Sequence, residues 1–259
     1  MAQNLKITVL GSGTSSGVPQ IGGNWGVCEP SNPKNRRRRP SILIQSETTT
    51  ILVDTGPDIH EQLTLWPTER IDAVIYTHDH ADHTHGIDDL RFQMYEQGRG
   101  AIPLYTDAAA LASVQAKFGY AFVSTTKSKF YPALLDDRMG HDNPFVIGDL
   151  EVQWFEQPHG AIHSLGLRIG DFAYSTDAVN FTEDHFQHLE GIKTWIVDAV
   201  RYEPHPSHAH LDMALSWVDR LKPKMTYLTH MSNLMDYDTL CAELPANVRP
   251  AYDGLVIEV

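Results

Sequence analysis

The stretch IDAVIYTHDHADH, residues 71–83, decides the fold. Ile71–Tyr76 is short and largely apolar, as expected of a buried β-strand. It runs directly into a His-x-His-x-Asp-His loop, whose four potential metal ligands are His78, His80, Asp82 and His83. Divalent cations such as zinc and manganese bind imidazole nitrogen and carboxylate oxygen. Alternate side chains of a loop can point to one side, so the first two histidines can share one metal while the last two ligands serve a second.

Other predicted strands also lead to potential ligands. These residues are Asp54, His159, Asp177 and His230. Strand ends at one edge of a sheet are where α/β proteins collect functional groups. Asp177 has two carboxylate oxygens and can bridge two cations, whereas His159 and His230 can complete the first and second sites. A solvated polar loop is the alternative interpretation of the histidine motif, and the joint placement of these further ligands argues against it.

The remaining pattern predicts one compact α/β domain over residues 1–259, without repeats or low-complexity linkers. Strands are predicted over Lys6–Leu10, Ser41–Gln45, Thr50–Asp54, Ile71–Tyr76, Glu151–Phe155, Ser164–Ile169, Asp171–Ser175, Trp195–Asp198 and Met225–Leu228. Helices are predicted over Ile59–Leu65, Asp107–Phe118 and Leu211–Leu221. This order suits two sheets sandwiched by helices, although periodicity alone does not single that architecture out.

The composition restricts the partners of the chain. Its formal net charge of -13 argues against a general nucleic-acid binder, which usually carries a basic surface. The chain has no apolar run of transmembrane length, and Met1–Gly11 has a strand pattern rather than that of a signal peptide. The cysteines Cys28 and Cys241 form no disulfide framework of the kind that secreted scaffolds need. We therefore expect a soluble cytoplasmic protein without a membrane partner.

The order of these ligands resembles the dinuclear site of the metallo-β-lactamase superfamily. The resemblance is closer to one branch, the phosphodiesterases related to PhnP of phosphonate degradation. The segments that carry it are Gly11–Pro19 (GSGTSSGVP), Asn35–Ser41 (NRRRRPS), Asp54–Asp58 (DTGPD) and His205–His208 (HPSH). It covers nearly the whole chain and implies an αββα sandwich of two mixed β-sheets flanked by helices. It also implies a homodimer, because relatives form dimers.

The resemblance further implies which side chains hold two divalent cations, manganese or zinc, with iron also accepted. By that resemblance the first cation takes His78, His80 and His159, the second takes Asp82, His83 and His230, and Asp177 bridges the two. Asp54 is expected to hold the metal loop by hydrogen bonds rather than to bind metal.

One departure from the relatives lies in the loop after the first strand. Relatives often carry a Cys-x-Cys-x-x-Cys cluster there, which helps to hold a structural zinc, whereas this chain has Gly23, Trp25 and Cys28. We predict that no structural zinc binds and that Cys28 is an ordinary free cysteine. Burial of Trp25 is then expected to order the loop.

His208 is the predicted general acid, a role that the resemblance assigns to its position in the His-Pro-Ser-His motif. A departing alkoxide needs a proton, and a histidine that binds no metal can supply it. The alternatives are a capping or supporting role for His208, or the same catalytic role for His205 or His210, the last of which is expected to begin the helix at Leu211.

Basic and hydroxyl side chains near the predicted site are candidates for direct contacts with the substrate. Arg201 and Ser207 are predicted to contact the substrate. The run Arg36–Arg39 could bind a substrate phosphate, because guanidinium groups bind phosphate bidentately, but a solvated basic loop fits the pattern equally well.

The leading hypothesis is a dinuclear hydrolase that attacks small cyclic or nucleotide-like phosphodiesters with a metal-bridging hydroxide. A ribonuclease of the tRNA 3′-processing type is an alternative, opposed by the acidic charge and by the lack of an obvious inserted arm for gripping tRNA. Hydrolysis of a thioester or lactam at the same site is another. A non-catalytic metal-binding protein would lack ligands, and none of the expected ligands is missing.

Overall fold

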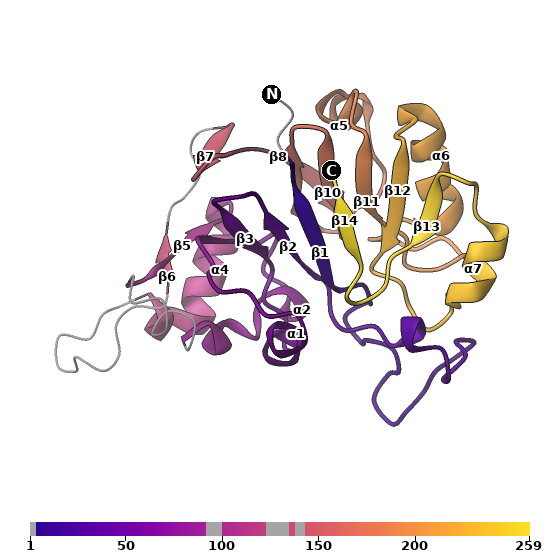
Figure 1. Ribbon diagram of the computed structural model, residues 1–259, viewed down its shortest axis with the longest axis horizontal. Coiled ribbons are helices and arrows are strands. Elements are labelled where there is room, and N and C mark those ends of the chain that lie inside the picture. Colours follow the sequence, from indigo (N-terminus) through magenta and orange to yellow (C-terminus); the bar gives the residue numbers. More distant parts are fainter. Residues whose placement is uncertain (1–3, 92–99, 123–134, 138–142) are drawn as a thin grey trace.

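The computed structural model describes residues 4–91, 100–122, 135–137 and 143–259 (Figure 1). Within these ranges the strands form two seven-stranded sheets. The first sheet has the order β14 (Val256–Glu258), β1 (Lys6–Gly11), β2 (Ser41–Gln45), β3 (Thr50–Val53), β4 (Ala73–Ile75), β5 (Ile102–Tyr105) and β6 (Leu135–Asp137). The second has the order β13 (Val248–Pro250), β12 (Met225–Thr229), β11 (Thr194–Asp198), β10 (Phe172–Ser175), β9 (Ile162–Ile169), β8 (Leu150–His159) and β7 (Phe145–Ile147).

Both sheets are mixed, as predicted. In the first sheet β14, β1, β2 and β3 pair antiparallel, and β3 to β6 pair parallel. In the second sheet β7 to β10 pair antiparallel, and β10 to β13 pair parallel. Parallel strands need crossover connections, and these connections carry the loops and helices that surround the strand ends.

The helices cover the outer faces of the two sheets (Figure 1). The described α-helices are α1 (Ile59–Leu65), α2 (Ala81–Thr84), α4 (Ala108–Phe118), α5 (Glu183–Leu189), α6 (Leu211–Leu221) and α7 (Tyr237–Glu243), and the 3-10 turns are η1 (Pro33–Asn35), η2 (Ile87–Asp89) and η3 (Gly119–Ala121). One apolar cluster lies between the sheets, a second joins α1 and α4 to the first sheet, and a third joins α5, α6 and α7 to the second. The layers are therefore αββα, and burial of apolar side chains on both faces of each sheet stabilises them.

Helix α6 shows how the sequence pattern produces this packing. Its buried residues Leu211, Ala214, Trp217 and Val218 recur at helical spacing and face the second sheet. His210 occupies the N-cap position, so the helix begins where the sequence indicated.

No helix in the described ranges is both long enough and apolar enough to cross a membrane.

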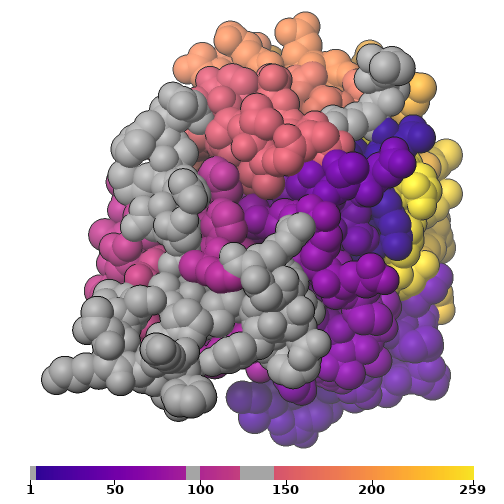
Figure 2. All heavy atoms as spheres, turned by 60° about the vertical axis from the view of Figure 1, so that its left-hand side comes forward, coloured from indigo at the N-terminus to yellow at the C-terminus, as the bar shows by residue number. Residues whose placement is uncertain are grey.

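The two sheets are also joined at the end opposite the Asp54 end of β3. There the β7–β8 turn meets the β2–β3 turn, and the Ser46 hydroxyl donates to Asp149 Oδ1 at 2.7 Å. The Thr49 hydroxyl donates to the same oxygen. Figure 2 shows these two segments side by side on one face of the molecule. These contacts connect strands from both sheets.

Strand β8 is longer than predicted, and the difference affects the site. The sequence pattern placed the end of this strand at Phe155, with His159 in a following loop. In the structure Pro158 pairs with His163 and His159 pairs with Ile162, so the strand continues to His159. His159 is therefore held by a β-ladder rather than by a loop.

The loop after β1 is ordered by a residue other than the predicted one. Trp25 is only half-buried, under the Arg36 guanidinium, whose Cζ lies 5.1 Å from the ring centroid. The buried residue is Arg37, which is 1% exposed and donates to the carbonyl oxygens of Ser232 at 3.0 Å and Met235 at 2.6 Å. Long-range hydrogen bonds from Arg37 therefore tie this loop to the segment after β12, and the prediction for Trp25 is wrong.

Candidate metal centre

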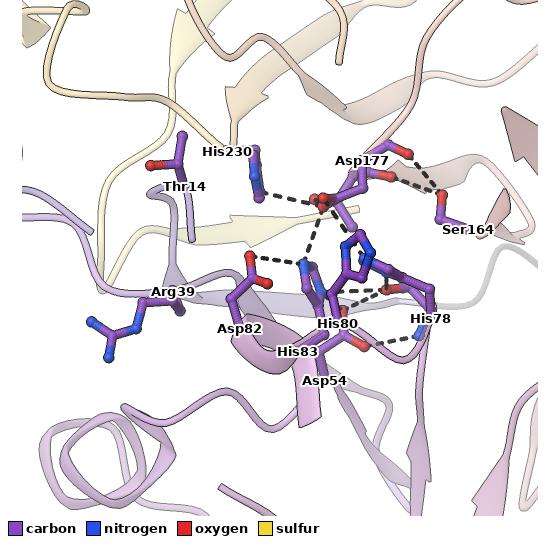
Figure 3. A network of polar contacts seen from close by, with 12 residues as sticks. Thr14, Arg39, Asp54, His78, His80, Asp82, His83, Ser164, Asp177 and His230 are labelled. Atoms are coloured by element: carbon purple, nitrogen blue, oxygen red, sulfur yellow. Dashed lines mark hydrogen bonds and ion pairs between the residues drawn. The ribbon is translucent and has the colours of Figure 1, made fainter. Parts of the chain in front are cut away.

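The predicted ligands gather where strands of both sheets end (Figure 3). Three of these strand-end residues have left-handed backbones, Asp54 with φ 62°, Asp177 with φ 53° and His230 with φ 58°. Residues other than glycine rarely adopt this conformation, which costs about 1–3 kcal/mol. Such strain is concentrated at functional sites, where the surrounding structure holds it in place.

The first group of potential ligands is His78, His80 and His159. One nitrogen from each ring lies within 4.8 Å of the other two. The His159 Nδ1 donates to the Ser207 carbonyl oxygen at 2.8 Å, which leaves Nε2 for the cluster, 3.3 Å from His80 Nδ1. His78 and His159 are buried, whereas His80 is exposed. This group is therefore reached from solvent on the His80 side.

The second group is fully buried and contains both carboxylates and imidazoles. Its members are Asp82, His83, Asp177 and His230, with one donor atom from each within 4.8 Å of the others. His83 Nε2 lies 3.2 Å from Asp177 Oδ2 and 3.4 Å from Asp82 Oδ2. His230 Nδ1 lies 3.3 Å from the same oxygen of Asp177.

Asp177 lies between the two groups and presents one oxygen to each. Its Oδ2 faces His83 and His230, as described above. Its Oδ1 lies 3.9 Å from His78 Nε2 and 3.7 Å from His159 Nε2. A carboxylate that binds two cations needs this division of its oxygens.

The donor atoms fit a pair of divalent cations. His78 Nε2, His83 Nε2 and His230 Nδ1 are buried and have no hydrogen-bond partner within the described part of the chain. A buried polar atom left without a partner costs about 1–3 kcal/mol, so three that converge on one carboxylate need an explanation. Imidazole nitrogen and carboxylate oxygen are ligands for zinc, manganese and iron, and cations at this point would satisfy all three atoms.

The charge states of three of the histidines also suit metal binding. Burial lowers the pKa of His78 and of His159, and it lowers the pKa of His230 to about 4. These rings are therefore neutral at pH 7, with a lone pair free for a cation. Burial would raise the pKa of the Asp177 carboxyl, but the surrounding histidines, led by His230 and His83, hold it well below its usual range.

Asp54 supports the centre through hydrogen bonds. It is fully buried and accepts from His83 Nδ1 at 2.7 Å, from the Thr77 backbone N–H at 2.8 Å and from the Thr77 hydroxyl at 2.9 Å. These bonds orient the His83 ring so that its Nε2 points into the cluster. Asp54 itself is not among the described groups of potential ligands.

His208 lies beside the cluster and has a carboxylate partner that the sequence reasoning missed. Its Nδ1 donates to Asp198 Oδ2 at 2.9 Å and lies 3.8 Å from Asp177 Oδ1. Asp198 is fully buried, ends β11 and also accepts from the Ala178 N–H at 3.0 Å. The signal in the sequence was that Asp198 ends a strand, as the other site residues do.

The other predicted substrate contacts have different partners. Arg201 is turned toward its own loop, because its Nε donates to the Glu203 carbonyl oxygen at 3.0 Å and its Nη2 donates to the Pro204 carbonyl oxygen. Ser207 orients His159 through its carbonyl oxygen, and its hydroxyl lies 3.3 Å from His205 Nδ1. Both residues therefore shape the loop that carries His208.

Comparisons with known proteins agree with this geometry. The family model described as a beta-lactamase superfamily domain matches residues 49–231. The chain is 34% identical in sequence to a diphosphatase from the PhnP family whose crystal structure is known. The two structures have a TM-score of 0.92, and the match covers 100% of this chain and 98% of that one. The short form of human tRNase Z has a TM-score of 0.70 over 97% of this chain and 98% of that one. At 17% identity, this second likeness concerns the fold alone.

A further relative is longer than this chain. The octanoyltransferase of Porphyromonas gingivalis is 30% identical over 256 residues, which are 97% of this chain and 51% of that protein. The chain therefore spans about half the length of the curated relative that it matches.

Proposed function

Because the chain belongs to the metallo-β-lactamase superfamily and is PhnP-like, we propose that it is a two-metal phosphodiesterase for small cyclic or nucleotide-like phosphodiesters. The family makes the chain a metal-dependent hydrolase, and the phosphodiester substrate is the proposed step beyond it. The observation that carries the proposal is Asp177, which presents one carboxylate oxygen to each group of imidazoles. When bound, two divalent cations supply Lewis acidity toward phosphoryl oxygens and lower the pKa of water.

The residues of the chain provide the proton for the leaving group. Burial would lower the pKa of His208, but the Asp198 and Asp177 carboxylates raise it to about 9. The ring is then protonated at neutral pH, with Nδ1 held by Asp198 and Nε2 available to donate. A departing alkoxide needs such a proton, whereas a thiolate leaves readily without one. This difference favours a phosphodiester over a thioester.

A second candidate is hydrolysis of a diphosphate bond. It is favoured by the likeness to the PhnP-family diphosphatase, which extends over the full length of both chains. The same cluster and the same His208 would serve this reaction, because it too transfers a phosphoryl group to water. The octanoyltransferase relative matches along only half its length and supports no substrate for this chain.

The test is metal content by elemental analysis, together with hydrolysis of bis-p-nitrophenyl phosphate. Turnover is measured before and after chelation, and again with manganese or zinc restored. We expect about two metals per chain and turnover that chelation abolishes. Assays with cyclic nucleotides and with a dinucleoside diphosphate then show whether a phosphodiester or a diphosphate is hydrolysed.

Other outcomes would contradict the proposal. Two metals without turnover of any diester or diphosphate would favour a thioester or a tRNA precursor, each of which can be assayed directly. Absence of both metal and activity after reconstitution would refute the two-metal centre. The homodimer and the cytoplasmic location stay predictions, and light scattering of the purified protein tests the first.

A further inference from the structure

The four consecutive arginines after Asn35 have different partners. Arg36 is exposed and stacks on Trp25. Arg37 is buried among backbone carbonyl oxygens. Arg38 makes ion pairs with the carboxylates on either side of it, through Nε to Glu61 at 2.9 Å and through Nη1 to Asp253 at 3.3 Å. The guanidinium groups of Arg37 and Arg38 are therefore used within the protein, whereas Arg36 lies over the Trp25 ring.

Arg39 differs from Arg37 and Arg38 because its terminal nitrogens are open. Its Nε lies 3.1 Å from Asp58 Oδ2, and its backbone N–H donates to the same oxygen at 2.8 Å. Nη1 and Nη2 have no hydrogen-bond partner among the described residues, and the side chain is 28% exposed. The Asp58 carboxylate thus forms an ion pair with the Nε edge of the guanidinium, without a hydrogen bond to Nε, and the two terminal nitrogens remain as donors that can bind a phosphate in parallel.

The position of Arg39 connects it to the metal centre. Gly56 separates its side chain from the metal loop, since a Cβ added there would lie 2.1 Å from the Asp82 carbonyl oxygen and 3.2 Å from Arg39 Cβ. A Cβ added at Gly17 would lie 3.4 Å from Arg39 Nη1. Figure 3 places Thr14 and Arg39 on the Asp82 side of the cluster, opposite Ser164. The open guanidinium therefore lies against the glycine-rich turn, and Figure 3 shows it directed away from the imidazoles.

That turn offers further hydrogen-bond donors. It is closed by the bond from the Gly17 N–H to the Thr14 carbonyl oxygen at 2.8 Å. The hydroxyls of Thr14 and Ser16 lie 3.1 Å apart. In the described part of the chain, the backbone N–H groups of Ser15 and Ser16 have no acceptor, and both residues are exposed. Hydroxyls and free backbone N–H groups beside an arginine are the donors that bind phosphate.

We propose that the Thr14–Gly17 turn and Arg39 form a subsite for a second anionic group of the substrate, a phosphate next to the phosphoryl group at the metal centre. This inference rests on the proposed function. The chain has a net charge of -13, and Arg39 supplies a local positive charge with open donors for a substrate that carries several negative charges. Substrates with a further phosphate are then preferred over diesters with a single charge.

The experiment compares two non-hydrolysed probes by calorimetry on the metal-loaded protein. Methylenediphosphonate carries two phosphoryl groups, and inorganic phosphate carries one. The measured quantity is the affinity for methylenediphosphonate divided by the affinity for inorganic phosphate. We expect Arg39→Gln to lower this ratio about tenfold, Arg39→Lys to lower it less, and Ser16→Ala to lower it about threefold. Arg36→Gln is the matched control, because this exposed arginine stacks on Trp25 away from the turn, and it should leave the ratio unchanged.

An unchanged ratio in Arg39→Gln, with the melting temperature and metal content of the wild type, would overturn the subsite. If Arg39→Gln does not fold, Ser16→Ala decides the matter, because Ser16 is exposed. The ratio is a binding measurement and remains valid if the wild type fails to hydrolyse bis-p-nitrophenyl phosphate. Failure of the proposed function is therefore distinguished from failure of the subsite.

Discussion

His208 donates from Nδ1 to Asp198 Oδ2 across 2.9 Å, and Asp198 is fully buried at the end of β11. The carboxylate fixes the tautomer and the orientation of the ring. Nε2 is then the atom through which the imidazole can exchange a proton. Since Asp198 also accepts from the Ala178 N–H next to Asp177, His208 and Asp177 are held by one hydrogen-bonded unit.

Asp198→Asn is expected to lower kcat about 100-fold while the metal content stays that of the wild type. The amide keeps the size of the side chain but removes the charge that keeps His208 protonated. His208→Gln should lower kcat by a similar factor, and the double variant should lower it little further, because the two residues act as a unit.

Steady-state kinetics and elemental analysis test this prediction. Asp171→Asn, at an exposed carboxylate paired with Lys193, is the control. Loss of metal in Asp198→Asn would contradict the assignment.

The pH dependence of activity should follow the protonation of His208. Because the pKa of His208 is raised to about 9, its proton is present at neutral pH, and activity should fall as the pH rises through about 9. His208→Gln should lose this alkaline limb, and Asp198→Asn should move it to lower pH. A pH–rate profile for each variant measures this, and an unchanged limb in His208→Gln would assign the titration to another group.

The same shift predicts an effect on stability. A histidine with a raised folded pKa stabilises the protein fully below its unfolded pKa, about 6.5, and the contribution is lost as the pH rises through about 9. The difference in melting temperature between the wild type and His208→Gln should therefore become smaller as the pH rises through about 9. A difference that grows instead would contradict the direction of the shift.

Metal removal is expected to destabilise the protein as well as to inactivate it. The centre gathers unpaired buried nitrogens and left-handed strand ends, which bound cations would hold together. Cations at a hundred times their dissociation constant stabilise the fold by about 3 kcal/mol, so chelation should lower the melting temperature. Asp177→Asn should lose metal and at least about 1,000-fold in activity. Asp212→Asn, at an exposed carboxylate on α6, should change neither the metal content nor the activity.

The clustering of the candidate metal ligands in the motif could be predicted because it follows from short-range features of the sequence. His78, His80, Asp82 and His83 lie within six residues after an apolar run, and the structure gathers them at one sheet edge. The helix over Leu211–Leu221 could be predicted from its apolar spacing, and it has these bounds. In each case neighbouring residues alone set the outcome.

The supporting residues could not be predicted, because their partners are distant in sequence. Nothing in four consecutive arginines indicates which one is buried. Arg37 is buried because the carbonyl oxygens of Ser232 and Met235, about 200 residues away, accept its hydrogen bonds. Asp198 looks like any strand-end aspartate until the fold brings His208 to it. Backbone carbonyl oxygens carry no sequence signature, so only the fold identifies such partners.

Arg37→Met is expected to lower the free energy of unfolding by about 3 kcal/mol. The thioether can fill part of the space, but the carbonyl oxygens of Ser232 and Met235 lose their donors and stay buried. Urea denaturation measures the change. Arg36→Met, at the exposed neighbouring arginine, should alter stability by less than about 0.5 kcal/mol. The loop after β1 should also become sensitive to limited proteolysis in Arg37→Met. Equal stability of the two variants would show that Arg37 does not hold the loop.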